Sequence, residues 1–252
     1  MANIVRCELP DGVHRFSPFT VSDYRDFLLV RNDMNTKSPE DQEKLIEELQ
    51  NDYFSDIPKE YRAFVFLKVY LSSIGKTKIP VKVECPKCGK AKMVLINFHQ
   101  EAVELPVVDV SGLRLKFKHP SKNYKENIAG LITENILTVE DSNGVYEWSE
   151  LSTENKVQVV EAIDIETLEL IIKKLNIFDF VLKYSCCDSH EIRYTNFMDI
   201  FKLLLNPDEV FTFYKINHLI VKQGYDLSSV MNMIPIERSI TLSLIEKELA
   251  QK

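Results

Sequence analysis

Residues 83–90 read VECPKCGK, and residues 185–192 read SCCDSHEI. In the first stretch, Cys85 and Cys88 are flanked by two alternating segments, IPVKVE before them and AKMVLINF after them. Such alternation predicts strands, so the cysteine pair should lie at the tip of a β-hairpin. Two thiolates on a turn of this kind are typical of a zinc ribbon, in which four ligands surround the ion. The sequence therefore requires a second pair of ligands.

The second stretch offers that pair. Cys187 and His190 have the same spacing as Cys85 and Cys88, and together the four form a set of three cysteines and one histidine, an accepted composition for structural zinc. Cys186 is then expected on the opposite side of the strand. Four protein ligands leave no position for a water molecule, which indicates a structural rather than a catalytic Zn²⁺.

Two alternatives stay open for this site. In one, Cys186 replaces Cys187 as the ligand. In the other, the first pair is a ribbon-derived turn that has lost its metal, and Cys186, Cys187 and His190 are ordinary residues. A redox-active pair is disfavoured, because the motif is flanked by strands instead of opening a helix in a βαβ unit.

Turn and cap signals predict the other elements. Before the first cysteine pair they are a hairpin turn at 10–12, N-cap residues at Thr20 and Ser38, a helix start after Pro58 and a helix stop at Gly75. After it they are short strands turning at Ser111–Gly112, a helix over 123–135, a polar break at 140–144, and helices after Ser152 and Asp164. From Met198 to Lys252 the pattern predicts helix in three pieces, interrupted at 206–207, 224 and 234–235.

These elements predict an α+β fold, a mainly helical body with short β-hairpins, two of which form the zinc-ribbon-like site. Because two turns far apart in sequence must meet at one ion, we expect a single compact domain over 1–252. Its possible sub-parts are 1–120, with the N-terminal hairpin, helices and first zinc knuckle, and 121–252, with the second knuckle in a helical part.

Composition narrows the function. The formal net charge is −7, so no overall positive field attracts nucleic acid. No apolar run is long enough for a bilayer span, and the first residues lack the order of a secretory signal, which favours a cytoplasmic protein without membrane contact. Phosphate-binding, nucleophile-elbow and HExxH motifs do not occur in the sequence, so we expect no enzyme activity. The scattered His14, His99, His119 and His218 receive no role.

Three further stretches carry a family resemblance: ELPDGVHRFSPFTVSDYRDFLL near the start, YLSSIGKTKIPVKVECPKCGK around the first cysteines, and FYKINHLIVKQGYDLSSVMNMIPIERSITLSLIEKEL near the end. Together they resemble the T4-like bacteriophage baseplate hub assembly proteins. The resemblance covers the first hundred residues best, followed by the last forty. This chain departs from the family pattern in having CDSH where a second cysteine pair is expected.

The resemblance implies a non-enzymatic late protein of tail assembly. Such a protein helps to form, or forms part of, the baseplate hub of a contractile tail. It acts like a chaperone that binds other phage baseplate hub or tail proteins. The implied location is the host cytoplasm during virion assembly, or the baseplate of the virion.

Two other functions are alternatives to this one. A zinc-ribbon adaptor of a transcription or replication complex is the main alternative, and the acidic net charge argues against direct DNA contact by such a protein. A zinc hydrolase requires an open coordination position, which the proposed four ligands deny.

Overall fold

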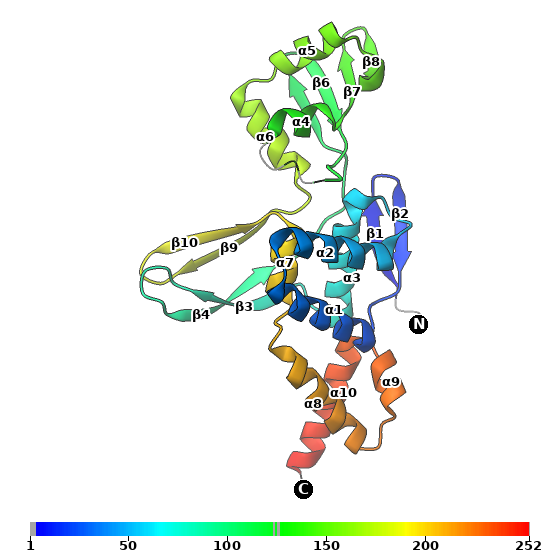
Figure 1. The fold of residues 1–252 in the computed structure, drawn as a ribbon, viewed down its shortest axis with the longest axis vertical. Coiled ribbons are helices and arrows are strands. Elements are labelled where there is room, and N and C mark those ends of the chain that lie inside the picture. Colours follow the sequence, from blue (N-terminus) through cyan, green and yellow to red (C-terminus); the bar gives the residue numbers. More distant parts are fainter. Residues whose placement is uncertain (1–3, 123, 125–126, 252) are drawn as a thin grey trace.

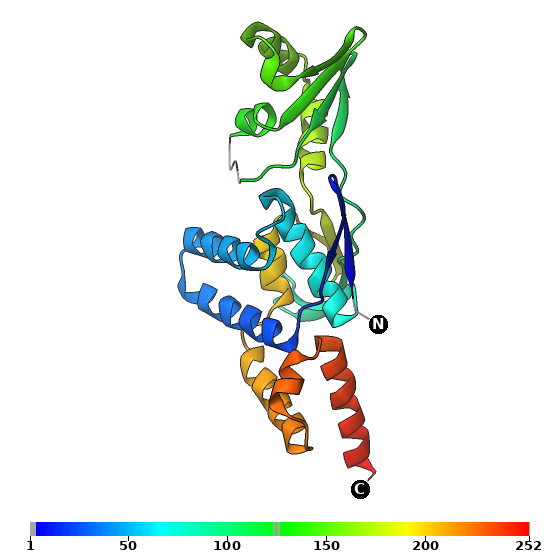
Figure 2. The same ribbon diagram turned by 90° about the vertical axis from the view of Figure 1, so that its right-hand side faces the viewer.

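The structure, a computed structural model, describes residues 4–122, 124 and 127–251. Three tiers are stacked along its longest axis (Figure 1), and a view turned by 90° shows the same order (Figure 2). Each tier has its own cluster of buried apolar side chains. We call the tiers the central body, the sheet module (residues 106–175) and the C-terminal module (residues 207–250).

The central body packs helices against two-stranded antiparallel hairpins. Its elements are β1 (Val5–Leu9), β2 (Gly12–Phe16), α1 (Val21–Asp33), a 3₁₀ turn (Met34–Thr36), α2 (Pro39–Phe54), α3 (Lys59–Ile74), β3 (Lys78–Glu84), β4 (Ala91–Asn97), β9 (Phe180–Ser185), β10 (Ser189–Tyr194) and α7 (Phe197–Leu204). The hairpins β3–β4 and β9–β10 project side by side from this body (Figure 1).

Helix α3 is apolar around most of its circumference and lies at the centre of the core, as its sequence predicts. Phe66 on α3 is 2% exposed, and its ring meets aromatic rings from four other parts of the chain. These rings belong to Phe19, Phe27, Phe54, Phe197 and Phe201. Edge-on and tilted contacts between aromatic rings stabilise a core by more than the burial of their apolar surface alone.

Local signals set the ends of these helices. The Thr20 hydroxyl accepts a hydrogen bond from the Asp23 amide, and Asp23 accepts one from the Thr20 amide, forming a capping box at the start of α1. At the start of α2 the Ser38 hydroxyl accepts a hydrogen bond from the Asp41 amide, with Pro39 in the first turn. Helix α3 ends at Gly75, whose φ of 70° lies in the left-handed region. The hairpin and the three helices predicted for this region are therefore confirmed.

The sheet module is inserted between β4 and β9. Its antiparallel sheet has the order β5-β6-β7-β8. Its elements are β5 (Val107–Val110), β6 (Leu113–Phe117), α4 (Ile128–Thr133), β7 (Ile136–Asp141), β8 (Gly144–Glu147), a 3₁₀ turn (Trp148–Glu150), α5 (Thr153–Glu161) and α6 (Ile165–Leu175).

Two predictions for this module need correction. The helix predicted over 123–135 is shorter, since α4 spans Ile128–Thr133; positions 123, 125 and 126 lie outside the described residues. The polar break at 140–144 is the turn of a hairpin between β7 and β8, in which Asp141 accepts hydrogen bonds from the backbone amides of Asn143 and Gly144.

The C-terminal module consists of helices around a small core of Ile220, Val230 and Ile245. Its helices are α8 (Glu209–Lys222), α9 (Leu227–Asn232) and α10 (Pro235–Ala250). The three predicted breaks are present, but they divide the described residues after 196 into four helices, α7 to α10, rather than three pieces. The module contacts the central body through the Val21 amide, which donates to the Met233 carbonyl.

The α+β fold class is confirmed: helices dominate, short antiparallel hairpins accompany them, and two hairpins carry the cysteines. The division into domains stays a prediction. The boundary between the sub-parts at residue 120 falls between β6 and α4, inside the sheet module. None of the helices in the described part of the chain combines the length and apolar character that a bilayer crossing requires.

Candidate metal centre

The first cysteine turn joins β3 to β4. The Cys85 amide donates to the Lys90 carbonyl, and the Gly89 amide donates to the Cys85 carbonyl, so the turn folds back on itself. Gly89 has a φ of 67°, a conformation that other residues adopt at a cost. Cys85 and Cys88 thereby lie at the tip of the hairpin, as predicted.

The second cysteine turn joins β9 to β10 and contains a residue that the sequence misplaced. Strand β9 ends at Ser185, and the Cys186 amide donates to the Asp188 carbonyl within the turn. Strand alternation therefore does not apply to Cys186 and Cys187. The expectation that Cys186 points away is wrong, because its sulfur lies in the same cluster as that of Cys187.

The two turns bring together four sulfur atoms. The Sγ atoms of Cys85, Cys88, Cys186 and Cys187 all lie within 4.8 Å of one another, and those of Cys88 and Cys186 are 3.6 Å apart. Four thiolates around a tetrahedral zinc ion, each about 2.3 Å from the metal, are separated by about 3.8 Å. The donor set and its spacing therefore fit a zinc ion bound by four cysteines.

His190 lies beside this cluster. Its Nε2 atom is 3.8 Å from the Sγ atom of Cys85, and its ring stacks on Tyr184 with 5.0 Å between the centroids. Three of the four ligands predicted from the sequence, Cys85, Cys88 and Cys187, thus lie in the cluster, and the fourth contacts its edge. The ligand set itself stays a prediction.

Polar contacts outside the cysteines also join the two hairpins. The Lys92 ammonium donates to the Ser185 carbonyl at 2.7 Å, Lys87 pairs with Asp188, and the Tyr184 hydroxyl donates to a backbone carbonyl of β3 at 3.3 Å. Most of these groups are exposed, so each contact contributes little by itself. A metal ion bound by the sulfur cluster would therefore be the strongest link between the two tips.

Electrostatics of the thiols also favour a cation. Hydrogen bonds from the backbone amides of Cys88 and Cys187 lower the pKa of Cys85 to about 5. A hydrogen bond with Cys88 raises the pKa of Cys187 to about 12, and the same kind of contact raises the pKa of Cys186. Neighbouring thiolates repel one another, so four of them share this space only when a cation neutralises their charge.

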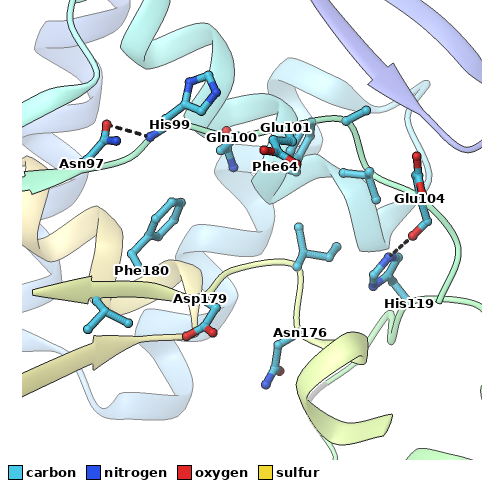
Figure 3. Close-up of a pocket in the computed structure, with 14 residues that line it drawn as sticks. Phe64, Asn97, His99, Gln100, Glu101, Glu104, His119, Asn176, Asp179 and Phe180 are labelled. Atoms are coloured by element: carbon cyan, nitrogen blue, oxygen red, sulfur yellow. Dashed lines mark hydrogen bonds between the residues drawn. The ribbon is translucent and has the colours of Figure 1, made fainter. Parts of the chain in front are cut away.

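A separate polar pocket of about 420 Å³ lies where the chain enters and leaves the sheet module (Figure 3). At its edge, the two ring nitrogens of buried His119 face the carbonyl oxygens of Leu175 and Glu104, at 3.0 and 3.1 Å. His119 has no role in the sequence-based prediction, and the structure gives it a structural one, because it joins the two connecting segments. Asp179, at the opposite side of the pocket, is bound by Arg193.

Comparison with known proteins defines the class of this chain. Residues 1–202 match the family model described as T4 bacteriophage base plate protein. The chain belongs to this family, since the match covers most of its length, and the resemblance recognised in the sequence is confirmed. Residues 204–250 match a second model, described as Baseplate hub assembly protein Gp51 C-terminal domain, which is not an enzyme family. No curated protein and no solved structure shows a significant similarity.

Proposed function

We propose that this protein is a chaperone-like assembly factor, or a component, of the phage baseplate hub, and that it acts by binding other hub or tail proteins. The observation that carries the proposal is the pair of family matches, which together cover residues 1–202 and 204–250 with baseplate proteins. The place of action is the cytoplasm of the infected host or the assembled baseplate. The role involves no covalent chemistry.

A structural zinc supports this role by joining two hairpins. The favoured ligands are Cys85, Cys88, Cys186 and Cys187, because their sulfurs already have nearly tetrahedral spacing. The set predicted from the sequence, in which His190 takes the place of Cys186, requires the imidazole to move inward from its contact with Cys85. A saturated set of protein ligands holds a metal for stability rather than for catalysis.

Metal analysis of three variants distinguishes the two ligand sets. If four cysteines bind the ion, Cys186→Ser lowers the zinc content well below one ion per chain, and His190→Ala leaves it unchanged. If His190 is the fourth ligand instead, His190→Ala lowers the zinc content and Cys186→Ser leaves it unchanged. Cys7→Ala is the matched control, because this buried thiol belongs to the core of the central body instead of the cluster.

Genetic complementation tests the hub role. A phage that lacks the gene is expected to produce no complete baseplates, and a plasmid copy is expected to restore both baseplates and plaques. Electron microscopy of lysates separates a defect in the hub from one in the tail tube or sheath. Normal baseplates in the absence of the gene would disprove the proposed function.

A further inference from the structure

The β3–β4 hairpin is strongly basic within an acidic protein. Residues 76–97 contain six lysines and one glutamate, a formal charge of +5, whereas the whole chain carries −7. Some of this charge lies at the tip, where Lys87 pairs with Asp188. Lys76 and Lys82 lie nearer the base and form no ion pair with any residue that the structure describes. A local field of this sign attracts acidic partners despite the net charge.

These two lysines line a groove of about 580 Å³ at the junction of the central body and the C-terminal module. One wall is the base of the β3–β4 hairpin, and other walls come from α1, α3, α7 and α10. Figure 1 shows the hairpin leaving the body beside α7, with the C-terminal module below it. The groove therefore lies where the segment matched by the first family model meets the segment matched by the second.

The charge inside this groove is unbalanced. Five cationic side chains line it, with one carboxylate, Glu209, which already accepts a hydrogen bond from the Tyr24 hydroxyl. The cationic residues are Arg31, Lys76, Lys82, Lys202 and Arg238. None of the five forms an ion pair within the described ranges 4–122 and 127–251.

Arg238 is the most informative of the five, because it is only 8% exposed. Its guanidinium donates to Asn217 at 3.1 Å and lies 4.8 Å from the centre of the Phe213 ring. Burial lowers its pKa, and the negative charge of nearby Glu209 acts in the opposite direction. A buried cation with no carboxylate in direct contact is unfavourable, and an incoming carboxylate would reduce that penalty through charge-assisted hydrogen bonds.

Arg31, which lines the groove from α1, also has an unpaired donor. Its Nη1 atom donates to Asn35 at 2.6 Å, but its buried Nε atom has no hydrogen-bond partner within the described part of the chain. Unsatisfied buried donors are rare in folded proteins and commonly mark a missing partner. Two guanidinium groups from separate elements of this groove thus form no ion pair with any residue that the structure describes, and one of them has an unpaired buried donor.

We propose that this groove binds an acidic segment of another baseplate protein, with Asp or Glu side chains placed between the β3–β4 hairpin and the C-terminal module. Apolar lining residues, including Ile74, Leu203 and Pro235, fit aliphatic side chains beside the carboxylates. That mixture, together with the negative net charge of the chain, favours a protein segment over a nucleic acid. The inference names the partner chemistry for the proposed hub function and rests on it.

The test compares two charge-reversal variants with the same change in net charge. The groove variant is Lys76→Glu with Lys82→Glu, and the control is Lys173→Glu with Lys215→Glu, at exposed positions outside the groove. Each is supplied on a plasmid to the phage that lacks the gene. The groove variant is expected to lower the plaque count about tenfold or more, and the control to plate like the natural protein. The two variants must have the same midpoint of thermal unfolding and the same zinc content, so that a difference in plating does not come from misfolding. If the charge-reversal variant does not fold, Lys76→Gln with Lys82→Gln replaces it.

Zero-length carbodiimide coupling identifies the contact directly, because it joins a lysine amine to a carboxylate. With extract of infected cells as the probe mixture, we expect coupling of Lys76, Lys82 or Lys202 to Asp or Glu of a phage baseplate protein. Equal plating of both variants, with coupling no stronger at these lysines than at Lys173 and Lys215, would overturn the inference while the hub role stands.

Two other outcomes separate the remaining possibilities. A gene that is dispensable for baseplates refutes the proposed function itself. Binding of random-sequence double-stranded DNA that is lost in the groove variant, with no carboxylate coupling at the groove lysines, assigns the groove to nucleic acid and overturns the acidic-protein proposal.

Discussion

Removal of the proposed zinc ion from the cysteine cluster is expected to lower the free energy of unfolding by about 4.7 kcal/mol. The cluster joins Cys88 to Cys186, which are 98 positions apart. In the chain-entropy model, closing a loop of about 100 residues in the unfolded chain costs about 4.7 kcal/mol. The folded protein already holds the four sulfurs together, so the ion binds it more tightly than it binds the unfolded chain and stabilises it by about this difference.

The measurement is thermal unfolding by circular dichroism, in reducing buffer, with zinc and then with a chelator. A change of 1 kcal/mol moves the midpoint of a chain of this size by about 2–4 °C, so the midpoint is expected to fall by about 10–20 °C. The Cys88→Ser variant should show the low midpoint even with zinc present. Cys7→Ala, which is also destabilised by a core change, should still lose stability when the chelator is added.

Two results would refute this reasoning. Protein that contains no stoichiometric metal after purification in zinc-supplemented medium would remove its premise. An unchanged midpoint on chelation, with the ion shown to be gone, would mean that the polar contacts between the hairpins already hold the two turns together and that the metal adds nothing to them.

Three further predictions concern the central body. Phe66→Ala should lower the free energy of unfolding by about 3–5 kcal/mol in a urea titration, because it empties the middle of an aromatic cluster; a loss below about 1 kcal/mol would contradict that. Gly75→Ala should lower the free energy of unfolding more than Gly112→Ala in the same titration. Both glycines have a positive φ, but only at Gly75 would the added Cβ collide with another side chain, that of Ile236. Equal losses of free energy in the two variants would exclude the collision. Thr20→Ala should lower the free energy of unfolding by about 1 kcal/mol, because the Asp23 amide loses its cap. An unchanged free energy of unfolding would show that the hydrogen bond from the backbone amide of residue 20 to the Asp23 carboxylate is sufficient to cap α1.

The sequence predicts those parts of the fold that local chemistry determines. Thr20, Ser38 and Gly75 each act on their own few residues, and each sets a helix end at the predicted position. The CPKCG turn is local as well, since Gly89 provides the conformation that the turn requires. That the two cysteine turns lie together is predicted by a different argument. A single cysteine pair supplies only two of the four ligands of a tetrahedral site, so a second pair must come from elsewhere in the chain.

The features that the sequence does not predict depend on context that no short window contains. Strand alternation misplaces Cys186, because the strand ends one residue earlier and a turn brings its sulfur inward. Strand β7 is short and directly follows a helical pattern, so its buried Ile136 and Val139 do not reveal a strand until its pairing partner is known. The cationic groove has no sequence signature, because Arg31, Lys82 and Arg238 come from three distant segments.

The proposed metal site and the proposed groove share one element, the β3–β4 hairpin, and this position relates their functions. Hairpins of two strands are only marginally stable alone, and the outer face of β4 packs little, since Met93 and Leu95 are 62% and 64% exposed. The inner face of the β3–β4 hairpin is held where Val81 and Val83 enter the core, and the cysteine cluster lies at its tip. Because Lys82 lies on the same strand only three residues before Cys85, an ion at the tip reduces the bending of the groove wall and the ordering cost of binding a partner. Metal and partner then favour the same conformation, and each must tighten the binding of the other.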